Sequence, residues 1–467
     1  MRGIRQIATA ITLLTFPALF ATGCASGAAG TAFTPLSPAS TASRWIDNRQ
    51  VAVPDATKAD WLQFGYDAGH SGFNPLEKTL NSSNLSKLAI AWNDKQIIQP
   101  NGIVAGDSVL YVDSMGQKNE GLYAFDSTTG KKKWSADVKL NGGWGSFQHA
   151  VSAIAGSMVV TPCSNGSTTK FLTGYCGVNA STGKIAWKAY CTEYQGNPCP
   201  GLANGVDTSP AYDNKLIFGQ ITQGVNEQPD TLAIDAQTGK TLWAVAGQYH
   251  CPDAGLTSEN PLPVSSGVVF AVLGCGDAQG NTEICAFAES SGKTVWCDES
   301  PTPYIEEMVA DASRLYVVEP GGGSTMVVQA FAVKSGASVW KSNIPAQGAA
   351  GLAVDTSRLY VEDGSVGVYA LQAGNGKPVW SNTTNGNLYV GGAIAVANGL
   401  VYTNGGGGNN GNVAIAAFDS AKGKLVYSTP SISNGSSQAS GVIVNGTIYT
   451  GCYTLCAFAI PAKKGAK

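Results

Sequence analysis

Apolar and polar residues alternate in short blocks along most of the chain. Runs rich in β-branched and aromatic residues, such as Leu122-Tyr123-Ala124-Phe125 and residues 327–331, are each followed by a cluster of turn-forming residues. Apolar runs of this length and composition, bounded by Gly, Asp, Ser and Thr, are typical of β-strands. The pattern therefore predicts an all-β protein built from many short strands.

One motif recurs at the end of these strands. Residues 124–134 and 233–243 both fit A-x-D-x-x-T-G-K-x-x-W. Looser copies are centred on Gly183, Gly292, Gly336, Gly376 and Gly423 and end in Trp187, Trp296, Trp340, Trp380 and Tyr427. Successive glycines of the motif are 40 to 56 residues apart, a period that indicates a propeller or solenoid rather than separate domains.

The motif has the chemistry of a hairpin turn that joins two strands. Asp126 or Asp235 can accept hydrogen bonds from its own backbone, and the glycine supplies the positive φ that the turn requires. Seven of the ten tryptophans occupy the last position of this unit. Because a tryptophan has a large apolar area to bury, we expect these residues to pack one unit against the next rather than to bind a ligand.

The two ends of the repeat region complement each other. Residues 85–92 resemble a last strand with its tryptophan, while residues 455–459 resemble a strand that precedes the turn. Pairing the two completes an eight-bladed β-propeller of four-stranded antiparallel blades and leaves no open edge. The expected anchors of the eight blades are Trp92, Trp134, Trp187, Trp243, Trp296, Trp340, Trp380 and Tyr427.

These repeats resemble the pyrroloquinoline-quinone-type (PQQ-like) eight-bladed propeller family. Residues 61–72, which read W-L-Q-F-G-Y-D-A-G-H-S-G, are similar to the segment that begins many of its domains, and the resemblance covers about residues 60–461. The family includes the scaffold lipoprotein of the outer-membrane protein assembly machinery and the propellers of quinoprotein dehydrogenases. The resemblance thus implies the fold, and leaves both a scaffold and an enzyme open as functions.

Charge narrows the possible partners. The chain of 467 residues carries 29 Lys and Arg against 32 Asp and Glu, so its net charge is −3, and charged residues make up only 13% of it. Without a basic face, nucleic-acid binding is disfavoured.

The N-terminus predicts export. Arg2 and Arg5 precede an apolar run, and residues 21–24 read A-T-G-C, which resembles a lipobox apart from Ala21 in place of the usual Leu. We expect a signal peptide at 1–23, a lipid-modified Cys24, a flexible tether at 24–58, the propeller at 59–461 and a basic tail at 462–467. Cleavage by an ordinary signal peptidase nearby is the alternative. Either places the protein outside the cytoplasm, as an envelope lipoprotein or a secreted protein.

Cysteine parity agrees with export, since setting aside Cys24 leaves ten of the eleven cysteines to form disulfides in an oxidising compartment. Cysteines at matching repeat positions predict three disulfides between second and third strands of a blade. Two cysteines close in sequence predict a fourth disulfide within one loop, and the two cysteines that remain are left to form the fifth. The expected pairs are Cys163–Cys176, Cys275–Cys285, Cys452–Cys456, Cys191–Cys199 and, by elimination, Cys251–Cys297. A metal site is disfavoured, because the chain has three histidines and no C-x-x-C pair.

The longest connections all fall on one face of the predicted ring, where binding sites are usually found. Several polar residues begin innermost strands or lie in neighbouring loops near this face. These candidates for a funnel at the axis are Trp144, His149, Asp207, Glu259, Asn260, Glu306 and Glu307. In a quinoprotein dehydrogenase such residues would hold Ca²⁺ and pyrroloquinoline quinone and supply a base. Solvated loop carboxylates are the simpler interpretation.

The sequence favours a non-catalytic role. It lacks adjacent cysteines, a C-x-x-C-H haem motif and any Ser-His-Asp arrangement, so no catalytic residue, cofactor or metal ligand is assigned. We expect an extracytoplasmic binding or scaffold propeller that presents its long-loop face to a protein or carbohydrate partner and is attached to a membrane by its lipid. The alternative is a PQQ- and calcium-dependent dehydrogenase of alcohols or sugars.

Overall fold

The computed structural model describes the repeat region as a ring of β-sheets. The described residues are 59–98, 100–114, 120–139, 151–165, 173–190, 193–194, 197–198, 205–206, 208–223, 228–245, 262–275, 282–299, 305–346, 348–363, 367–383, 389–390, 394–403, 405–406, 415–429, 441–452 and 454–461. Among them, the helical structure is a single 3-10 turn at Leu85–Lys87. The predicted lipidation residue Cys24 and the proposed signal peptide lie outside the described residues, as does the tether.

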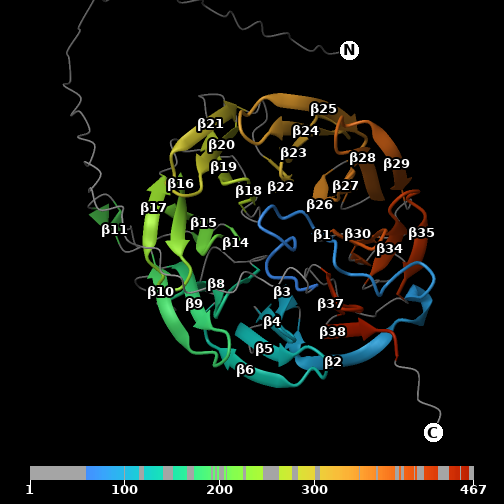
Figure 1. Ribbon diagram of the computed structural model, residues 1–467, viewed down its shortest axis with the longest axis horizontal. Coiled ribbons are helices and arrows are strands. Elements are labelled where there is room, and N and C mark those ends of the chain that lie inside the picture. The colour runs from blue at the N-terminus through green and yellow to red at the C-terminus, as the bar shows by residue number, and fades with distance from the viewer. Residues whose placement is uncertain are drawn as a thin grey trace, which may run out of the picture. The chain divides into compact units, whose positions relative to one another are not determined.

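Eight blades of four antiparallel strands surround an axis, as the sequence predicted (Figure 1). In each blade the first strand is innermost. Blade 1 comprises β3 (Pro100–Gly106), β4 (Val109–Ser114), β5 (Gly121–Asp126) and β6 (Lys132–Ala136), and blade 2 comprises β7 (Ala153–Ala155), β8 (Met158–Ser164), β9 (Thr173–Asn179) and β10 (Ile185–Tyr190). Blade 3 comprises β14 (Ala211–Asp213), β15 (Leu216–Gln223), β16 (Gln228–Asp235) and β17 (Thr241–Val245), and blade 4 comprises β18 (Val264–Ser265), β19 (Val268–Cys275), β20 (Thr282–Ala288) and β21 (Thr294–Glu299).

The remaining blades repeat this order, and the last is completed from the other end of the chain. Blade 5 comprises β22 (Glu307–Ala310), β23 (Arg314–Pro320), β24 (Met326–Ala332) and β25 (Ser338–Ile344), and blade 6 comprises β26 (Ala349–Val354), β27 (Arg358–Asp363), β28 (Gly367–Gln372) and β29 (Pro378–Thr383). Blade 7 comprises β31 (Ala395–Ala397), β32 (Leu400–Thr403), β34 (Ala416–Asp419) and β35 (Leu425–Ser428), and blade 8 comprises β36 (Val442–Val444), β37 (Thr447–Gly451), β38 (Thr454–Ala459) and β2 (Ala89–Ile98). Additional short strands are β1 (Phe73–Asn74), β11 (Glu193–Tyr194), β12 (Asn197–Pro198), β13 (Gly205–Val206), β30 (Tyr389–Val390) and β33 (Gly405–Gly406).

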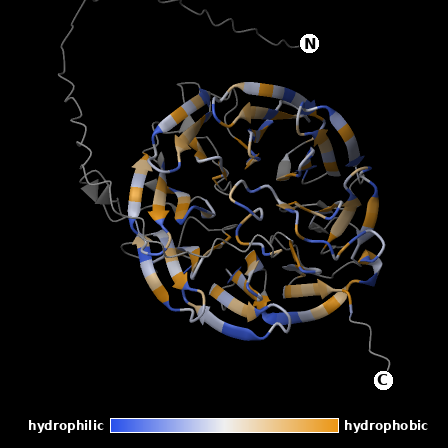
Figure 2. Ribbon diagram, viewed as in Figure 1, coloured by the Kyte–Doolittle hydropathy of each residue, from blue (hydrophilic) through white to orange (hydrophobic). Residues whose placement is uncertain are grey.

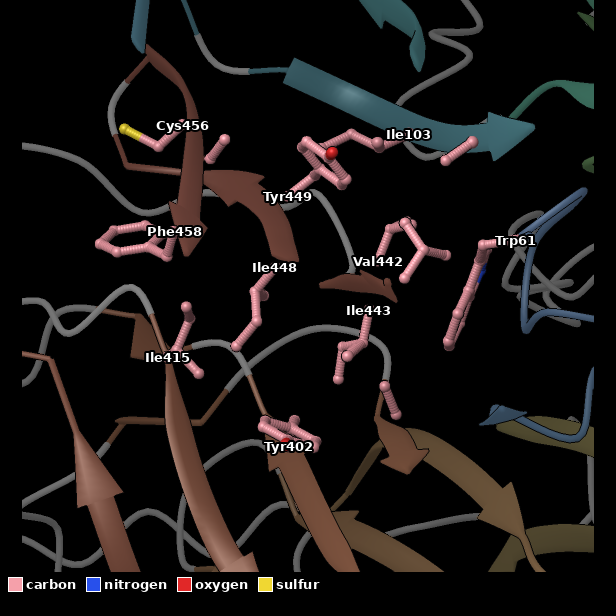
Figure 3. Packing of buried hydrophobic residues seen from close by; sticks show 14 of the residues in the cluster. Trp61, Ile103, Tyr402, Ile415, Val442, Ile443, Ile448, Tyr449, Cys456 and Phe458 are labelled. Carbon is pink, nitrogen blue, oxygen red and sulfur yellow. The ribbon is translucent and has the colours of Figure 1, made fainter. Parts of the chain in front are cut away.

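The ring closes where the sequence predicted. β2 pairs antiparallel with β38, placing Trp92 opposite Ala457. Buried residues of blades 1, 7 and 8, including Ile103, Tyr402 and Val442, form one apolar cluster around this closure together with Trp61 (Figure 3). The inner and middle strands of each blade are buried on both faces, which explains why their residues are mostly hydrophobic. Along the outermost strands, hydrophobic residues alternate with hydrophilic ones (Figure 2).

Each motif tryptophan packs one blade onto the next, so the expected packing role is confirmed. The indole N–H donates to a backbone carbonyl in the turn of the following blade. The seven bonds run from Trp92 to Ser127, Trp134 to Ala180, Trp187 to Ala236, Trp243 to Glu289, Trp296 to Val333, Trp340 to Ala373 and Trp380 to Ser420, at 2.8 to 3.1 Å. The eighth anchor, Tyr427, meets no such turn, because in blade 8 the third and fourth strands come from opposite ends of the chain.

The turn glycine is required twice over. Gly239 has φ +72°, and a Cβ atom built on it would lie 2.6 Å from the ring of Trp187. The same contact recurs between Gly292 and Trp243 at 2.7 Å. A side chain at these positions would therefore both strain the backbone and push the neighbouring blade away.

Residues 59–74, which we call the axial segment, cross the centre of the ring (Figure 1). Successive residues of this segment form hydrogen bonds with the innermost strands of blades 1 to 8, in that order. The partners are Trp61 with Ala105, Leu62 with Ile154, Gln63 with Tyr212, Ala68 with Val264, Gly69 with Ala310, Ser71 with Val354, Gly72 with Val396, and Asn74 with Ile443. One stretch of chain thus ties all eight blades together.

Candidate functional site

The axial segment distinguishes the two faces of the ring. It bonds to the inner strands near their C-terminal ends, for example at Ala310, the last residue of β22. The hairpin turns of the repeated motif lie on this same side, because third strands run parallel to first strands; we call it the turn face. The opposite side, where first strands begin and second strands end, is the loop face.

Two of the predicted funnel residues are described, and both lie on the loop face. Glu307 begins β22 and is 8% exposed. Glu306 precedes it, donates its backbone N–H to the carbonyl of Val318 at 2.9 Å, and is half-buried, which raises the pKa of its carboxyl. The other candidates, Trp144, His149, Asp207, Glu259 and Asn260, lie outside the described residues.

Glu307 belongs to a group of buried carboxylates that we call the acidic group. Its other members are Glu362 and Asp363, which end the second strand of blade 6 and are fully buried. Burial raises the pKa of Glu362 well above its usual range, and the negative charges of Glu307 and Asp363 raise it further. Among the described residues, neither carboxylate oxygen of Glu362 has a hydrogen-bond partner. The carboxyl must therefore be neutralised by a proton or balanced by a cation.

The sequence interpretation missed Glu362 and Asp363 because it examined only the starts of first strands. A signal was present in the second strands. Leu110-Tyr111-Val112 and Leu359-Tyr360-Val361 are identical runs, and each is followed by an acidic residue. A carboxylate directly after a buried strand is unusual enough to mark the position.

Asp113 occupies the same position in blade 1 but is fully hydrogen-bonded. It accepts bonds from the backbone N–H and hydroxyl of Ser152, at 2.8 and 2.9 Å, and from the hydroxyl of Thr161 at 3.0 Å. Both partners belong to blade 2, so this carboxylate joins two blades. Burial outweighs these bonds and raises its pKa to about 6.

Gln220 takes the equivalent position in blade 3 and is also used for joining blades. Its side-chain amide donates to the hydroxyl of Thr231 at 3.1 Å and to the carbonyl of Val272, in blade 4, at 2.8 Å. Polar residues at this position thus bridge adjacent blades in two of the cases described, and Glu362 differs from both.

The disulfides agree with the sequence in two cases and correct it in a third. Cys163 is bonded to Cys176, and Cys452 to Cys456, as expected. Cys285, however, is bonded to Cys297, so the expected pairs Cys275–Cys285 and Cys251–Cys297 are wrong.

Strand register explains this correction. Cys285 and Cys297 lie directly opposite each other on β20 and β21, with Cα atoms 4.1 Å apart. The pairing of β19 with β20 shifts between Val272 and Cys275, which places Cys275 opposite Thr282 and away from Cys285. Cys191, Cys199 and Cys251 lie outside the described residues.

Among the described residues, Glu283, Cys285 and Cys297 form a group of three potential metal ligands whose ligand atoms lie within 4.8 Å of one another. The two sulfurs are bonded to each other, and a disulfide sulfur does not ligate a metal as a thiolate does. This grouping is therefore not a metal site.

The turn face carries a cavity of about 430 Å³ beside the axial segment. Asp67, Asp213, Asp311 and Asp355 line it. Asp67 accepts both hydrogen bonds of Ser71, and Asp311 and Asp355 accept bonds from Tyr316 and Tyr360. These three carboxylates stabilise turns and strands, so the cavity is a weaker candidate than the acidic group.

His70, the one histidine among the described residues, is fully buried in the axial segment. Its ring contacts Phe64 edge-on, and neither nitrogen has a partner in the described structure. Burial lowers its pKa to about 3, so the ring is neutral and packs as an apolar group.

Comparison with known proteins identifies relatives of two kinds. The family model described as "Outer membrane protein assembly factor BamB" matches residues 79–224, 229–327 and 324–467. Among curated proteins, the dehydrogenase subunit of alcohol dehydrogenase (quinone) of Gluconobacter oxydans is 25% identical over 252 residues, covering 51% of this chain and 30% of that protein. Quinoprotein glucose dehydrogenase of the same organism is 24% identical over 288 residues, covering 58% and 31%. The chain thus spans less than a third of either relative.

Solved structures share the fold. Quinohemoprotein alcohol dehydrogenase from Comamonas testosteroni superposes with a TM-score of 0.65 at 14% identity, over 89% of this chain and 83% of that one. A europium-containing methanol dehydrogenase gives a TM-score of 0.57 at 13% identity, over 87% and 91%. At sequence identities this low, the similarity to these structures concerns the fold alone.

No helix within the described residues is long and apolar enough to cross a membrane.

Proposed function

Because the chain belongs to the PQQ-like propeller family described as outer membrane protein assembly factor BamB, we propose that it is a non-catalytic binding or scaffold propeller. In this proposal its loop face binds a protein or carbohydrate partner outside the cytoplasm. Hydrogen bonds join successive blades of the ring, and the longest connections between strands belong to its loop face, a combination suited to recognition.

The observation that carries this proposal is how buried polar side chains are used. In blades 1 to 4, Asp113 bonds Ser152, Tyr175 bonds the carbonyl of Thr208, and Gln220 bonds that of Val272. These groups hold adjacent blades together. A cofactor site needs donors and acceptors that converge on the ligand instead, so this use of polar side chains favours a structural ring.

We further propose that the protein is anchored to a membrane through Cys24. Paired cysteines support an oxidising compartment, since three disulfides occur among the described residues. Mass spectrometry of the native protein tests the anchor. We expect a mature N-terminus at Cys24 carrying a diacylglyceryl group, and an unmodified start elsewhere would contradict it.

Site-specific photo-crosslinking in intact cells tests the binding face. A photoreactive residue replacing Glu306 lies on the loop face, and one replacing Thr129 lies on the turn face as a matched control. We expect one discrete crosslinked product from position 306 and none from position 129. Equal products from both positions, or none from either, would contradict a partner bound at the loop face.

A second candidate is a PQQ- and calcium-dependent dehydrogenase of alcohols or sugars. Its support is the sequence similarity to quinoprotein dehydrogenases, together with carboxylates on the loop face. Glu306 and Glu307, with Asp207, Glu259 and Asn260, would be the oxygen ligands and base, and these hard donors suit Ca²⁺. The bound quinone would supply the oxidising group.

Dye reduction tests this candidate. Purified protein loaded with pyrroloquinoline quinone and Ca²⁺ is given a panel of alcohols and aldoses. Under the scaffold proposal we expect no substrate-dependent reduction. Turnover that disappears in Glu306→Gln would make the dehydrogenase the better account.

A further inference from the structure

Glu362 is a completely buried carboxylate that the fold leaves unpaired. Its exposure is 0%, and both of its oxygens lack a hydrogen-bond partner among the described residues. Leaving a buried carboxylate without partners is costly, because the group gives up its hydration and gains nothing in return. Either a proton or a cation must compensate it.

Comparison with Asp113 shows what is missing. Asp113 lies two residues after Tyr111, which pairs with Ala124, and Glu362 lies two residues after Tyr360, which pairs with Ala370. The two carboxylates therefore hold the same place in blades 1 and 6. In both cases the next blade is where hydrogen-bond donors are expected.

Blade 7 lacks the donor that blade 2 provides. Ser152, which bonds Asp113, comes just before Ala153, the partner of Val160. The equivalent residue in blade 7 is Ile394, just before Ala395, the partner of Tyr402. An isoleucine has no hydroxyl, so the bond that the Ser152 hydroxyl donates to Asp113 has no counterpart at the boundary between blades 6 and 7.

A buried and unpaired oxygen atom also occurs on blade 7. Thr403 is equivalent to Thr161, whose hydroxyl bonds Asp113, but the hydroxyl of Thr403 has no partner among the described residues. Thr403 is 1% exposed. Unpaired oxygens therefore occur on both sides of one blade boundary.

We propose that Glu362 is the direct protein ligand of a Ca²⁺ ion at the loop-face end of the boundary between blades 6 and 7, with the hydroxyl of Thr403 as a second oxygen ligand. The acidic group supplies oxygen donors and concentrated negative charge, which Ca²⁺ prefers, and no sulfur or imidazole. The described carboxylates do not form a cage of three within ligand distance of one another. The ion therefore retains water, while Glu307 and Asp363 stabilise its charge from nearby.

The direct ligands of this site differ from the candidates for a quinone site. Glu362 and Thr403 end second strands of blades 6 and 7, whereas Glu307, which lies near the ion only as a charge, begins a first strand. The site requires neither a quinone nor catalysis. It extends the proposed function by making a cation part of the ring.

Calorimetric titration of the purified full chain with CaCl₂ tests the proposal. The protein is first dialysed against a chelator, and no quinone is added. We expect one saturable Ca²⁺ site and a higher melting temperature in CaCl₂ than in chelator. Glu362→Gln is close in shape and should fold, lose this saturable binding and melt at the same temperature in both buffers. Thr403→Val should bind about tenfold more weakly.

Asp113→Asn is the matched control, because it changes the equivalent carboxylate of blade 1. It should keep the wild-type response to Ca²⁺. No Ca²⁺ binding by the wild-type chain would overturn the proposal and leave Glu362 as a protonated acid. Undiminished binding by Glu362→Gln, or an equal rise in melting temperature with MgCl₂ at the same ionic strength, would overturn it as well.

Discussion

The same strand position holds a satisfied carboxylate in one blade and an unsatisfied one in another. Asp113 receives three hydrogen bonds from blade 2, while Glu362 faces the equivalent boundary without them. Repetition in the fold makes this difference informative, because each blade is a control for the others. Two differences separate the positions: Ile394 replaces Ser152 and its hydroxyl, and the hydroxyl of Thr403 does not bond the carboxylate as that of Thr161 does.

Asp113 is expected to make stability depend on pH. Its carboxyl titrates at 3.8 in a model peptide and at about 6 when buried here. Between these values the folded state holds a proton that the unfolded state has released, so the free energy of unfolding falls as pH rises. We expect a loss of about 2 to 3 kcal/mol across this window, which Asp113→Asn removes. Urea denaturation at a series of pH values measures it, and parallel profiles for the two proteins would contradict it.

The disulfide predictions from sequence succeeded only where the register of the second and third strands is regular. The bonds Cys163–Cys176 and Cys452–Cys456 follow from repeat position. The shift between Val272 and Cys275 has no sequence signature, so Cys285 was assigned the wrong partner. Burial of Glu362 depends on the packing of two blades and could not be deduced from one strand.

At the scale of elements, the turn and the tryptophan form a single joint between blades. The joint is made by a glycine with positive φ, an indole lying against it and an indole N–H bonded to a turn carbonyl. All three parts are present in the eleven-residue motif. For this reason the strands, their order and the role of the tryptophans were predictable from sequence.

Substitutions of two glycines should distinguish the stability lost by disturbing the tryptophan contact from the stability lost by backbone strain alone. Gly239 and Gly267 both have positive φ, +72° and +78°, but only Gly239 would place a Cβ atom against a tryptophan, since nothing lies within 4 Å of Gly267. We expect Gly267→Ala to cost about 1 kcal/mol and Gly239→Ala about 2 to 4 kcal/mol. Chemical denaturation measures both. Equal losses would mean that the contact with Trp187 contributes nothing.

At the scale of the whole molecule, two devices close the ring. The first is the pairing of β2 with β38, which the sequence predicted from its two incomplete ends. The second is the axial segment, which bonds to every blade. From the sequence, residues 61–72 were identified only as a segment that begins such domains. Their hydrogen bonds to all eight blades could not be predicted, because contacts between an irregular segment and eight separate strands produce no periodic pattern in the sequence.

Truncation should distinguish the tether from the axial segment. A chain beginning at residue 59 is expected to unfold with the same free energy as the full mature chain. A chain beginning at residue 75 loses the bonds to all eight blades, at about 1 kcal/mol each, and should be less stable by about 5 to 10 kcal/mol. Urea denaturation compares them. A destabilised first truncation would show that the tether packs on the blades, and an unaffected second one would contradict the role given to the axial segment.

The central claim, that this propeller is a binding ring rather than a quinoprotein, is tested most directly by quinone binding. Cofactor-free protein is titrated with pyrroloquinoline quinone in saturating Ca²⁺, and tryptophan fluorescence is followed. The account predicts no saturable quenching, with Ca²⁺ binding unaffected by the quinone. Saturable quenching at one quinone per chain, weakened by Glu306→Gln or Glu307→Gln, would contradict it and assign the loop face to a cofactor.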